Sequence, residues 1–178
     1  MKLIGPRIEQ GRRNQILMSG ETKQKSFEEQ LVFGKEFEDM FARYLISRGW
    51  FVTPKYLFCE EGAPLLIGKD SKYAIPDIDC AKGGKRLWVE CKRKAKMKKY
   101  PATGYPYSNH ICYKKVQEIT GDQVYIVFWD ESINKYYGNF LDELEKHIYS
   151  DNWIFQGYKR HIVFRYPEAF NFLSIGAI

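Results

Sequence analysis

The sequence predicts a single α/β domain, and three observations support this fold class. A chain of 178 residues has the length of one domain with one substantial core. Hydrophobic residues make up 44% of the chain and aromatic residues 16%, which excludes a mainly disordered protein. Segments with helical spacing alternate with strand-like runs, in the order helix, strand, hairpin, helix, strand.

The first predicted element is a helix over residues 26–48. Ser26 and Glu29 form a capping box at its start, and Gly49 follows its end. Its apolar positions are Phe27, Leu31, Phe37, Phe41, Leu45 and Ile46. Glu38 lies midway between two of these positions and projects beside the apolar stripe, where a carboxylate is costly unless a cation or hydrogen bonds compensate it.

The next informative element is a predicted hairpin, with strands at residues 74–81 and 86–91. The turn between them contains Gly83 and Gly84, a strong hairpin signal. Side chains alternate across a strand, so Glu90 and Lys92 share one face. The turn brings Asp77 back beside them, and two carboxylates and one amine therefore converge.

That group of side chains suits a divalent cation. Mg²⁺ prefers oxygen ligands and keeps several waters, so one or two carboxylates and substrate phosphate oxygens suffice. A bound cation polarises a phosphodiester and activates water. Lys92 can position that water or neutralise developing charge, and the main-chain carbonyl of Cys91 is a further candidate ligand.

These residues resemble the motif of the PD-(D/E)XK nuclease superfamily. Asp77 fits its first acidic position, Glu90 the second and Lys92 the lysine. The motif is most similar to that of archaeal Holliday junction resolvases and related phage or restriction-type nucleases, over roughly residues 27–130. The resemblance implies a restriction-endonuclease-like core, with a central mixed β-sheet flanked by helices. It also implies hydrolysis of DNA phosphodiester bonds with Mg²⁺ or Mn²⁺.

A third carboxylate is expected from the first helix. The resemblance implies a glutamate there near the metal, and Phe37-Glu38 is similar to the family's Phe-Glu pair. Glu36 is the alternative on the same helix. Asp79 shares a strand face with Asp77 and is a ligand or a hydrogen-bonding support.

Basic residues are concentrated around this motif. The net charge of +6 and a pI near 9.0 indicate a polyanionic partner. Between residues 82 and 99, Glu90 is the single acidic residue. The basic residues expected to bind nucleic acid are Lys85, Arg86, Arg93, Lys94, Lys96, Lys98 and Lys99.

The second helix is expected over residues 110–120, ended by Gly121. Tyr113 and Lys114 are candidates for contacting nucleic acid, and Gln117 for supporting the site. Which of the three faces the site stays open at this stage. The preceding segment, residues 100–109, reads as a connection with exposed aromatic residues, some suited to stacking on bases.

The remaining chain yields simpler expectations. Residues 1–25 form a basic arm, either a flexible contact to nucleic acid or a poorly ordered terminus, and 26–178 the nuclease-like domain. Further predicted elements are a strand at 50–58, a loop at 59–71, strands at 123–129 and 136–140, a helix at 141–149, and a strand at 161–166 that completes the sheet.

The cysteines and the hydropathy predict a cytoplasmic protein. Cys59, Cys80, Cys91 and Cys112 are widely spaced without a Cys-x-x-Cys pair, which disfavours zinc and indicates reduced thiols. No apolar run reaches the length of a membrane span, and no signal-peptide core is visible.

The sequence therefore predicts a metal-dependent endo- or exodeoxyribonuclease, working as a homodimer if both strands are cut. The residues themselves do not separate DNA from RNA. The alternatives are a non-catalytic nucleic-acid-binding module that retains the fold, and a protein-interaction domain with a basic surface.

Overall fold

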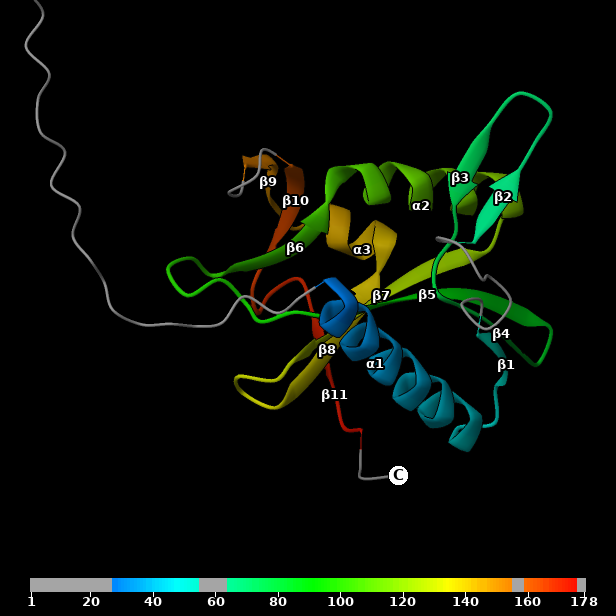
Figure 1. Ribbon diagram of the computed structural model, residues 1–178, viewed down its shortest axis with the longest axis horizontal. Helices are drawn as coiled ribbons and strands as arrows, with labels where there is room; N and C mark the ends of the chain where they lie inside the picture. The colour runs from blue at the N-terminus through cyan, green and yellow to red at the C-terminus, as the bar shows by residue number, and fades with distance from the viewer. Residues whose placement is uncertain (1–26, 55–63, 155–158, 176–178) are drawn as a thin grey trace, which may run out of the picture.

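The computed structural model describes residues 27–54, 64–154 and 159–175. Within these ranges it contains three helices and three sheets (Figure 1). The helices are α1 (Phe27–Ser47), α2 (Tyr107–Thr120) and α3 (Leu141–Glu145). None of them is long and apolar enough to cross a membrane.

The central sheet has six strands within the described residues, in the order β1, β4, β5, β7, β8 and β11. These strands are Phe51–Pro54, Ile78–Lys82, Lys85–Arg93, Gln123–Asp130, Lys135–Phe140 and Asn171–Leu173. β5 and β7 are parallel and the other neighbours antiparallel. The sheet is therefore mixed, which confirms the predicted fold class.

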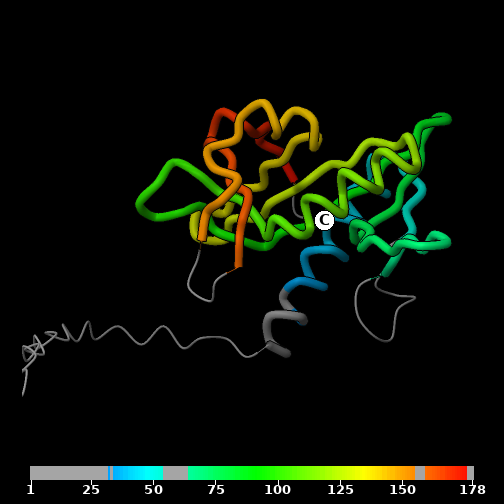
Figure 2. The backbone as a smooth tube through the Cα atoms, turned by 90° about the horizontal axis from the view of Figure 1, so that it is seen from above, coloured from blue at the N-terminus to red at the C-terminus, as the bar shows by residue number. Residues whose placement is uncertain are grey.

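Two smaller sheets complete the described fold. The three-stranded sheet has the order β6 (Ala102–Pro106), β10 (Arg160–Arg165) and β9 (Ile148–Ile154). A short hairpin joins β2 (Leu65–Ile67) to β3 (Lys72–Ala74). These two units lie toward opposite ends of the molecule (Figures 1 and 2).

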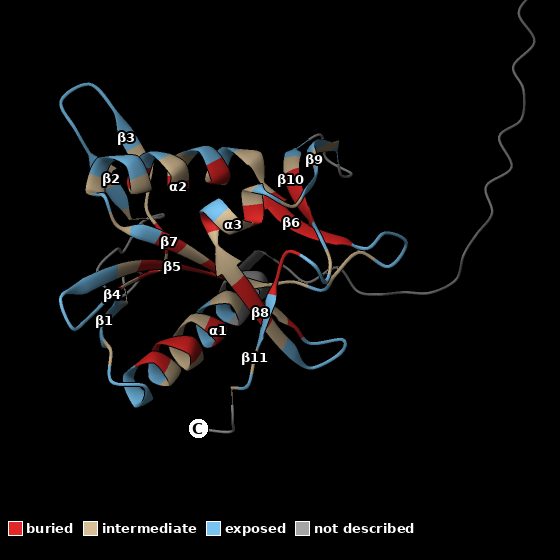
Figure 3. Cartoon of the chain, turned by 180° about the vertical axis from the view of Figure 1, so that it is seen from behind, coloured by how far each residue is buried: buried red, intermediate tan, exposed pale blue. Residues whose placement is uncertain are grey.

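Two hydrophobic clusters cover the two faces of the central sheet. On one face, Phe37 and Phe41 of α1 pack with Val89 and Val127. On the other face lies a larger cluster, whose members include Trp88, Tyr105, Val116, Ile126, Phe128 and Ile162. Val127 and its neighbours at 126 and 128 thus point to opposite faces, as strand alternation requires. Figure 3 shows these buried positions along the central strands and on α1.

The β4–β5 hairpin forms around the predicted turn, but its first strand begins at Ile78 instead of residue 74, because Lys72–Ala74 pairs with β2 as β3. Lys82 pairs with Lys85, and both turn glycines have positive φ, 56° at Gly83 and 75° at Gly84. Such values suit a two-residue hairpin turn and favour glycine over other residues. The turn fixes the register that places the motif residues.

Three sequence predictions were wrong in the C-terminal half. The strand expected at 161–166 belongs to the small sheet and does not complete the central one. The helix expected at 141–149 ends at Glu145, because the following residues form β9. The segment expected to be a connection at 100–109 contains β6 and the first turn of α2.

Two further elements were not predicted, β11 and the β2–β3 hairpin, and both have three-residue strands. The first predicted helix, the second helix and the strands at 123–129 and 136–140 are confirmed to within a few residues. The predicted arm at 1–25, Cys59 and part of the predicted 50–58 strand lie outside the described residues.

Candidate active site

Asp77 and Glu90 lie side by side at the point where β4 begins. Ile78 pairs with Val89, so Asp77, one residue earlier, comes opposite Glu90. Asp77 is partly buried, and its Oδ2 accepts a hydrogen bond from the backbone N–H of Cys91 at 2.8 Å. Glu90 is 2% exposed, in the middle of β5. The hairpin register therefore produces the predicted pair of carboxylates.

Lys92 completes this group from the same strand. Its Nζ forms an ion pair with Oε1 of Glu90, two residues earlier on the same face. Burial acts to lower the pKa of Lys92, but Glu90 and Asp77 raise it above its usual value. Lys92 is therefore a charged ammonium held among carboxylates.

Glu38 adds a third carboxylate from α1. Among the residues that the structure describes, its buried Oε2 has no hydrogen-bond partner. Burial and the nearby charge of Glu90 raise its pKa to about 7, against an opposing effect of Lys92 and Lys35. The alternative on this helix, Glu36, lies elsewhere, because its Oε2 accepts a hydrogen bond from Nη1 of Arg93 at 2.9 Å.

The three carboxylates influence one another electrostatically. Burial raises the pKa of Asp77 well above its usual range, and the charges of Glu90 and Glu38 raise it further. Lys92 and the Cys91 N–H oppose this rise. Like charges that share a poorly solvated region disfavour ionisation unless a cation is added.

The donor chemistry of this group fits a hard divalent cation. Carboxylate oxygens are its preferred ligands, and the unpartnered Oε2 of Glu38 is an available acceptor. The side chains do not form a compact cage, however. In the described part of the chain, no three His, Cys, Asp or Glu residues are grouped closely enough to hold an ion. Lys92 occupies one oxygen of Glu90 instead.

Tyr113 of α2 lies behind Glu90. It is 3% exposed, and its hydroxyl accepts a hydrogen bond from Nδ2 of Asn109 at 3.3 Å. Burial, the charges of Glu90 and Asp77, and a hydrogen bond with Glu90 raise its pKa well above the usual range. Of the three α2 residues that the sequence left open, Tyr113 is thus the one that faces the site. It is too buried, however, for direct contact with nucleic acid. The sequence did not indicate a role for Asn109, which lies one helical turn before Tyr113. The i, i+4 spacing of the two residues on α2 is the pattern that could have indicated their contact.

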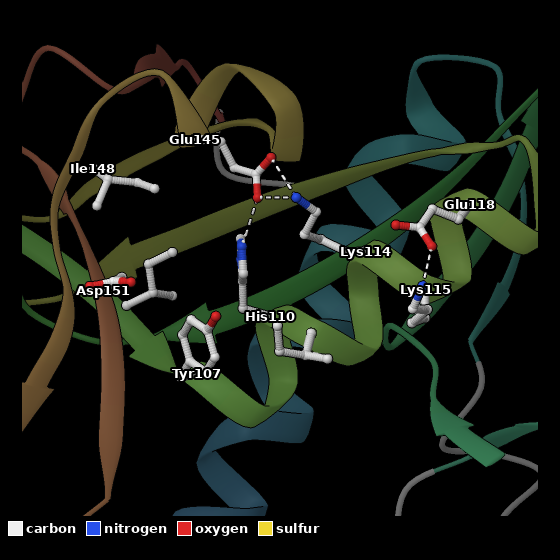
Figure 4. Close-up of a pocket in the computed structure, with 10 residues that line it drawn as sticks. Tyr107, His110, Lys114, Lys115, Glu118, Glu145, Ile148 and Asp151 are labelled. Carbon is white, nitrogen blue, oxygen red and sulfur yellow. Dashed lines mark hydrogen bonds and ion pairs between the residues drawn. The ribbon is translucent and has the colours of Figure 1, made fainter. Parts of the chain in front are cut away.

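The other α2 candidates lie away from the carboxylates. Nζ of Lys114 lies 2.8 Å from Oε1 of Glu145, and Nε2 of His110 lies 2.9 Å from the same oxygen (Figure 4). Gln117 donates to Oδ1 of Asp142 at 2.7 Å and accepts from the Val124 N–H at 3.1 Å. Lys114 and Gln117 therefore tie α2 to α3 and β7.

Asp79 and Arg86 form a structural pair across the hairpin. The guanidinium of Arg86 donates two hydrogen bonds to Asp79, at 2.8 and 2.7 Å. It also lies over the ring of Trp88, 4.7 Å from its centroid. Of the two roles left open for Asp79, this geometry fits support of the hairpin better than metal ligation.

The basic run does not form one surface. Arg93 points toward α1, where it pairs with Glu36 and Glu131 and lies 4.3 Å from the centroid of Trp129. Nζ of Lys94 donates to the Gly104 carbonyl at 2.9 Å. Strand alternation separates neighbouring basic residues because successive side chains point to opposite faces.

The remaining basic candidates lie at separate places in the structure. Lys85 is exposed at the hairpin turn, at the start of β5. Nζ of Lys96 lies 5.8 Å from the ring centroid of Tyr166. Lys98 and Lys99 are exposed in the segment that leads to β6. Of the predicted nucleic-acid contacts, Lys85, Lys98 and Lys99 are thus exposed to solvent, as is Arg86, which pairs with Asp79.

Comparison with known proteins identifies a similar fold. A solved structure of Hjc, a Holliday junction resolvase from the archaeal hyperthermophile Archaeoglobus fulgidus, superposes with a TM-score of 0.50. The match covers 75% of this chain and 88% of that chain, with 13% sequence identity. No protein-family model and no curated protein sequence matches this chain. At this identity the likeness shows the fold, and the chemistry has to be argued from the site.

Proposed function

We propose that this protein is a divalent-cation-dependent nuclease that hydrolyses DNA phosphodiester bonds in a structure-directed manner. The observation that carries the proposal is the placement of Asp77 opposite Glu90 and of Lys92 against Glu90 at the β4–β5 hairpin, with the charge of Glu38 of α1 acting on Asp77. The fold shared with a Holliday junction resolvase supports the same assignment and favours branched DNA as substrate. We further propose a cytoplasmic location, which the unpaired thiols of Cys80, Cys91 and Cys112 favour.

Each residue has a defined part in this proposal. Asp77, Glu90 and the Cys91 carbonyl would hold Mg²⁺ or Mn²⁺, with Glu38 as an additional acceptor. The bound cation would stabilise charge on the phosphate and lower the pKa of a water. Lys92 holds a positive charge where negative charge develops on the scissile phosphate. Tyr113 of α2 orients Glu90 through a hydrogen bond.

The test is cleavage of labelled branched, single-stranded and linear duplex DNA by the purified chain. We expect cleavage with Mg²⁺ or Mn²⁺, none with EDTA, and none by Glu90→Gln under any condition. Glu118→Gln is the matched control because Glu118 is exposed on the outer side of α2, where it pairs with Lys115.

A second readout is independent of activity. Mg²⁺ should raise the thermal stability of the wild type and of Glu118→Gln, but much less that of Glu90→Gln. Equal stabilisation of all three proteins, with no cleavage of any substrate, would overturn the proposal. Salt-sensitive DNA binding under those conditions would assign the chain to the non-catalytic alternative.

A further inference from the structure

Three aromatic side chains form a separate patch on the small sheet, outside the candidate active site. Trp153 of β9 lies 4.8 Å from Tyr100 and 6.1 Å from Tyr149, measured between ring centroids. Tyr100 is 43% exposed and Tyr149 38% exposed, and Trp153 is half-buried. We call Tyr100, Tyr149 and Trp153 the aromatic patch.

The aromatic patch is distinct from the hydrophobic core. Within the described residues, none of its members is among the buried residues of either core cluster, and the half-buried Trp153 is not among those packed against one. Its strand partner β10 presents Ile162 and Phe164 to the core. His161, which pairs with Trp153, is one residue from Ile162 and so points to the opposite face. Val163, on the same face as His161, is fully buried, whereas Tyr100 and Tyr149 beside Trp153 stay exposed to solvent. These exposed rings need a role other than filling the core.

The surroundings of the patch are basic and lead to the candidate active site. Lys98 and Lys99 are exposed directly before Tyr100. Lys94, two residues after Lys92 and directly after β5, donates from Nζ to the Gly104 carbonyl of β6 at 2.9 Å. β6 pairs with β10, and His161 of β10 pairs with Trp153, so cationic side chains extend from the candidate active site to the small sheet.

The acidic residue on this strand is already paired. Asp151 lies between Tyr149 and Trp153 in sequence, and its Oδ2 is 3.2 Å from Nη2 of Arg160. A patch of exposed aromatic rings bordered by Lys98 and Lys99 matches the chemistry of single-stranded nucleic acid, in which bases stack on rings and phosphates contact lysines. A double helix offers no free base faces for such rings, because its bases stack on one another.

We propose that the aromatic patch stacks on unpaired bases of the DNA substrate. The preferred substrate would then be DNA with a single-stranded segment next to the cleaved phosphodiester, such as a flap, overhang or opened branch. This inference rests on the proposed function for the identity of the polymer, and it adds the substrate class. Binding of unpaired bases by the aromatic patch would explain why cleavage depends on DNA structure, which the carboxylates alone do not explain.

The experiment compares binding of oligothymidine with binding of an abasic oligonucleotide of equal length and charge. Fluorescence anisotropy in EDTA prevents cleavage. The full chain should bind oligothymidine about tenfold more tightly, because each stacked base contributes on the order of 1–3 kcal/mol. The double variant Tyr100→Leu/Tyr149→Leu removes the two exposed rings and leaves the half-buried Trp153, so it should lose most of the preference for oligothymidine, with an unchanged salt dependence.

The matched control is Phe51→Leu/Phe172→Leu. These rings are 83% and 50% exposed and lie on the two edge strands of the central sheet, β1 and β11. The control should retain the preference for oligothymidine. Retention of wild-type denaturation midpoints by both double variants will show that the folds are intact.

Failure of this inference is distinguishable from failure of the proposed function. Equal binding of both oligonucleotides by the wild type overturns the stacking role, whatever the cleavage assay shows. If the wild type also self-associates in sedimentation and the patch variant does not, the patch is a contact between copies of the chain. A base preference without metal-dependent cleavage would instead support the patch and contradict the nuclease.

Discussion

Substitution of Glu38 gives a direct test of the electrostatics of the candidate active site. Its Oε2 is buried without a hydrogen-bond partner in the described structure, and its pKa is raised to about 7 by burial and by Glu90. We expect Glu38→Gln to stabilise the protein in EDTA at mildly alkaline pH, by about 1 kcal/mol after allowance for solvent screening. Urea denaturation measures the difference.

Addition of the cation should reverse the order of stability of the two proteins. Mg²⁺ should stabilise the wild type more than Glu38→Gln, since the glutamate then has a compensating charge. Glu36→Gln is the control, because its carboxylate pairs with Arg93 away from the site. A lower stability of Glu38→Gln in EDTA would show that its carboxylate is compensated within the protein.

His110 gives a pH dependence outside the candidate active site. Its Nδ1 lies 3.0 Å from the hydroxyl of Tyr105, and Nε2 lies 2.9 Å from Glu145, which also binds Lys114. Burial lowers the pKa of His110 below its usual 6.5, although the hydrogen bond to Glu145 opposes the shift. The unfolded chain therefore binds more protons as the pH falls below 6.5, so folding stability is retained above that value and lost below it.

Replacement of this histidine should reduce the acid sensitivity. We expect the difference in unfolding free energy between neutral and mildly acidic pH to be smaller in His110→Gln than in the wild type. His161→Gln serves as the comparison: burial lowers the pKa of His161 in the same direction, but its imidazole is less buried than that of His110, so the change should be smaller. An identical pH dependence in the wild type and His110→Gln would contradict the assignment.

At the scale of single residues, the sequence predicted the candidate site well where spacing along one hairpin decides the geometry. Asp77, Glu90 and Lys92 come together because strand alternation and the Gly83-Gly84 turn determine which side chains meet. The surface of basic residues was predicted less well. Alternation also sends Arg93 toward Glu36, and the partner of Arg86, Asp79, is not evident from a count of charges.

At the scale of elements, Gly104 explains how β6 packs against β10. A Cβ atom at this position would lie 2.7 Å from the Cα of Val163 and would overlap the Ile162 carbonyl. We expect Gly104→Ala to lower the unfolding free energy by about 3 kcal/mol, because neither strand backbone can yield without losing the pairing.

Gly68→Ala is the matched control for that substitution. Its Cβ would meet the Ser71 side chain at 3.5 Å, an ordinary contact in the loop between β2 and β3. Its effect should stay within about 1 kcal/mol. Chemical denaturation of both variants distinguishes them, and a mild effect of Gly104→Ala would mean that β6 and β10 pack less closely than described.

The sequence predicted helices and strands correctly in long, strongly patterned segments. It failed where the pairing with a distant strand determines whether a segment is a strand or which sheet it joins. The central strand β7 is a continuous apolar run, and the sequence of α1 has a clear apolar stripe followed by Gly49. The pattern of β10 indicates a strand but carries no information on which sheet it joins. Tyr, Pro and Gly in β6 resemble a loop locally, and only the pairing with β10 makes this segment a buried strand.

At the scale of the whole molecule, the candidate active site and the aromatic patch lie at the two ends of the segment that joins β5 to β6. β5 carries Glu90 and Lys92, and the chain then runs through Lys98, Lys99 and Tyr100 into β6. The small sheet lies at that end of the molecule (Figure 1). A substrate bound along this path would present a phosphate to the carboxylates and bases to the patch.

The central claim is that Asp77 acts in catalysis through a bound cation, and one comparison tests it most directly. The rate at which a four-way DNA junction is cleaved in Mg²⁺ is measured for the wild type and Asp77→Asn, with junction affinity measured in Ca²⁺. We expect a loss in rate of about a hundredfold or more, since even residues that only support a metal ligand contribute up to about a hundredfold. Affinity and folding should be unchanged. Equal rates, or a variant that loses junction binding and folding together, would contradict the account.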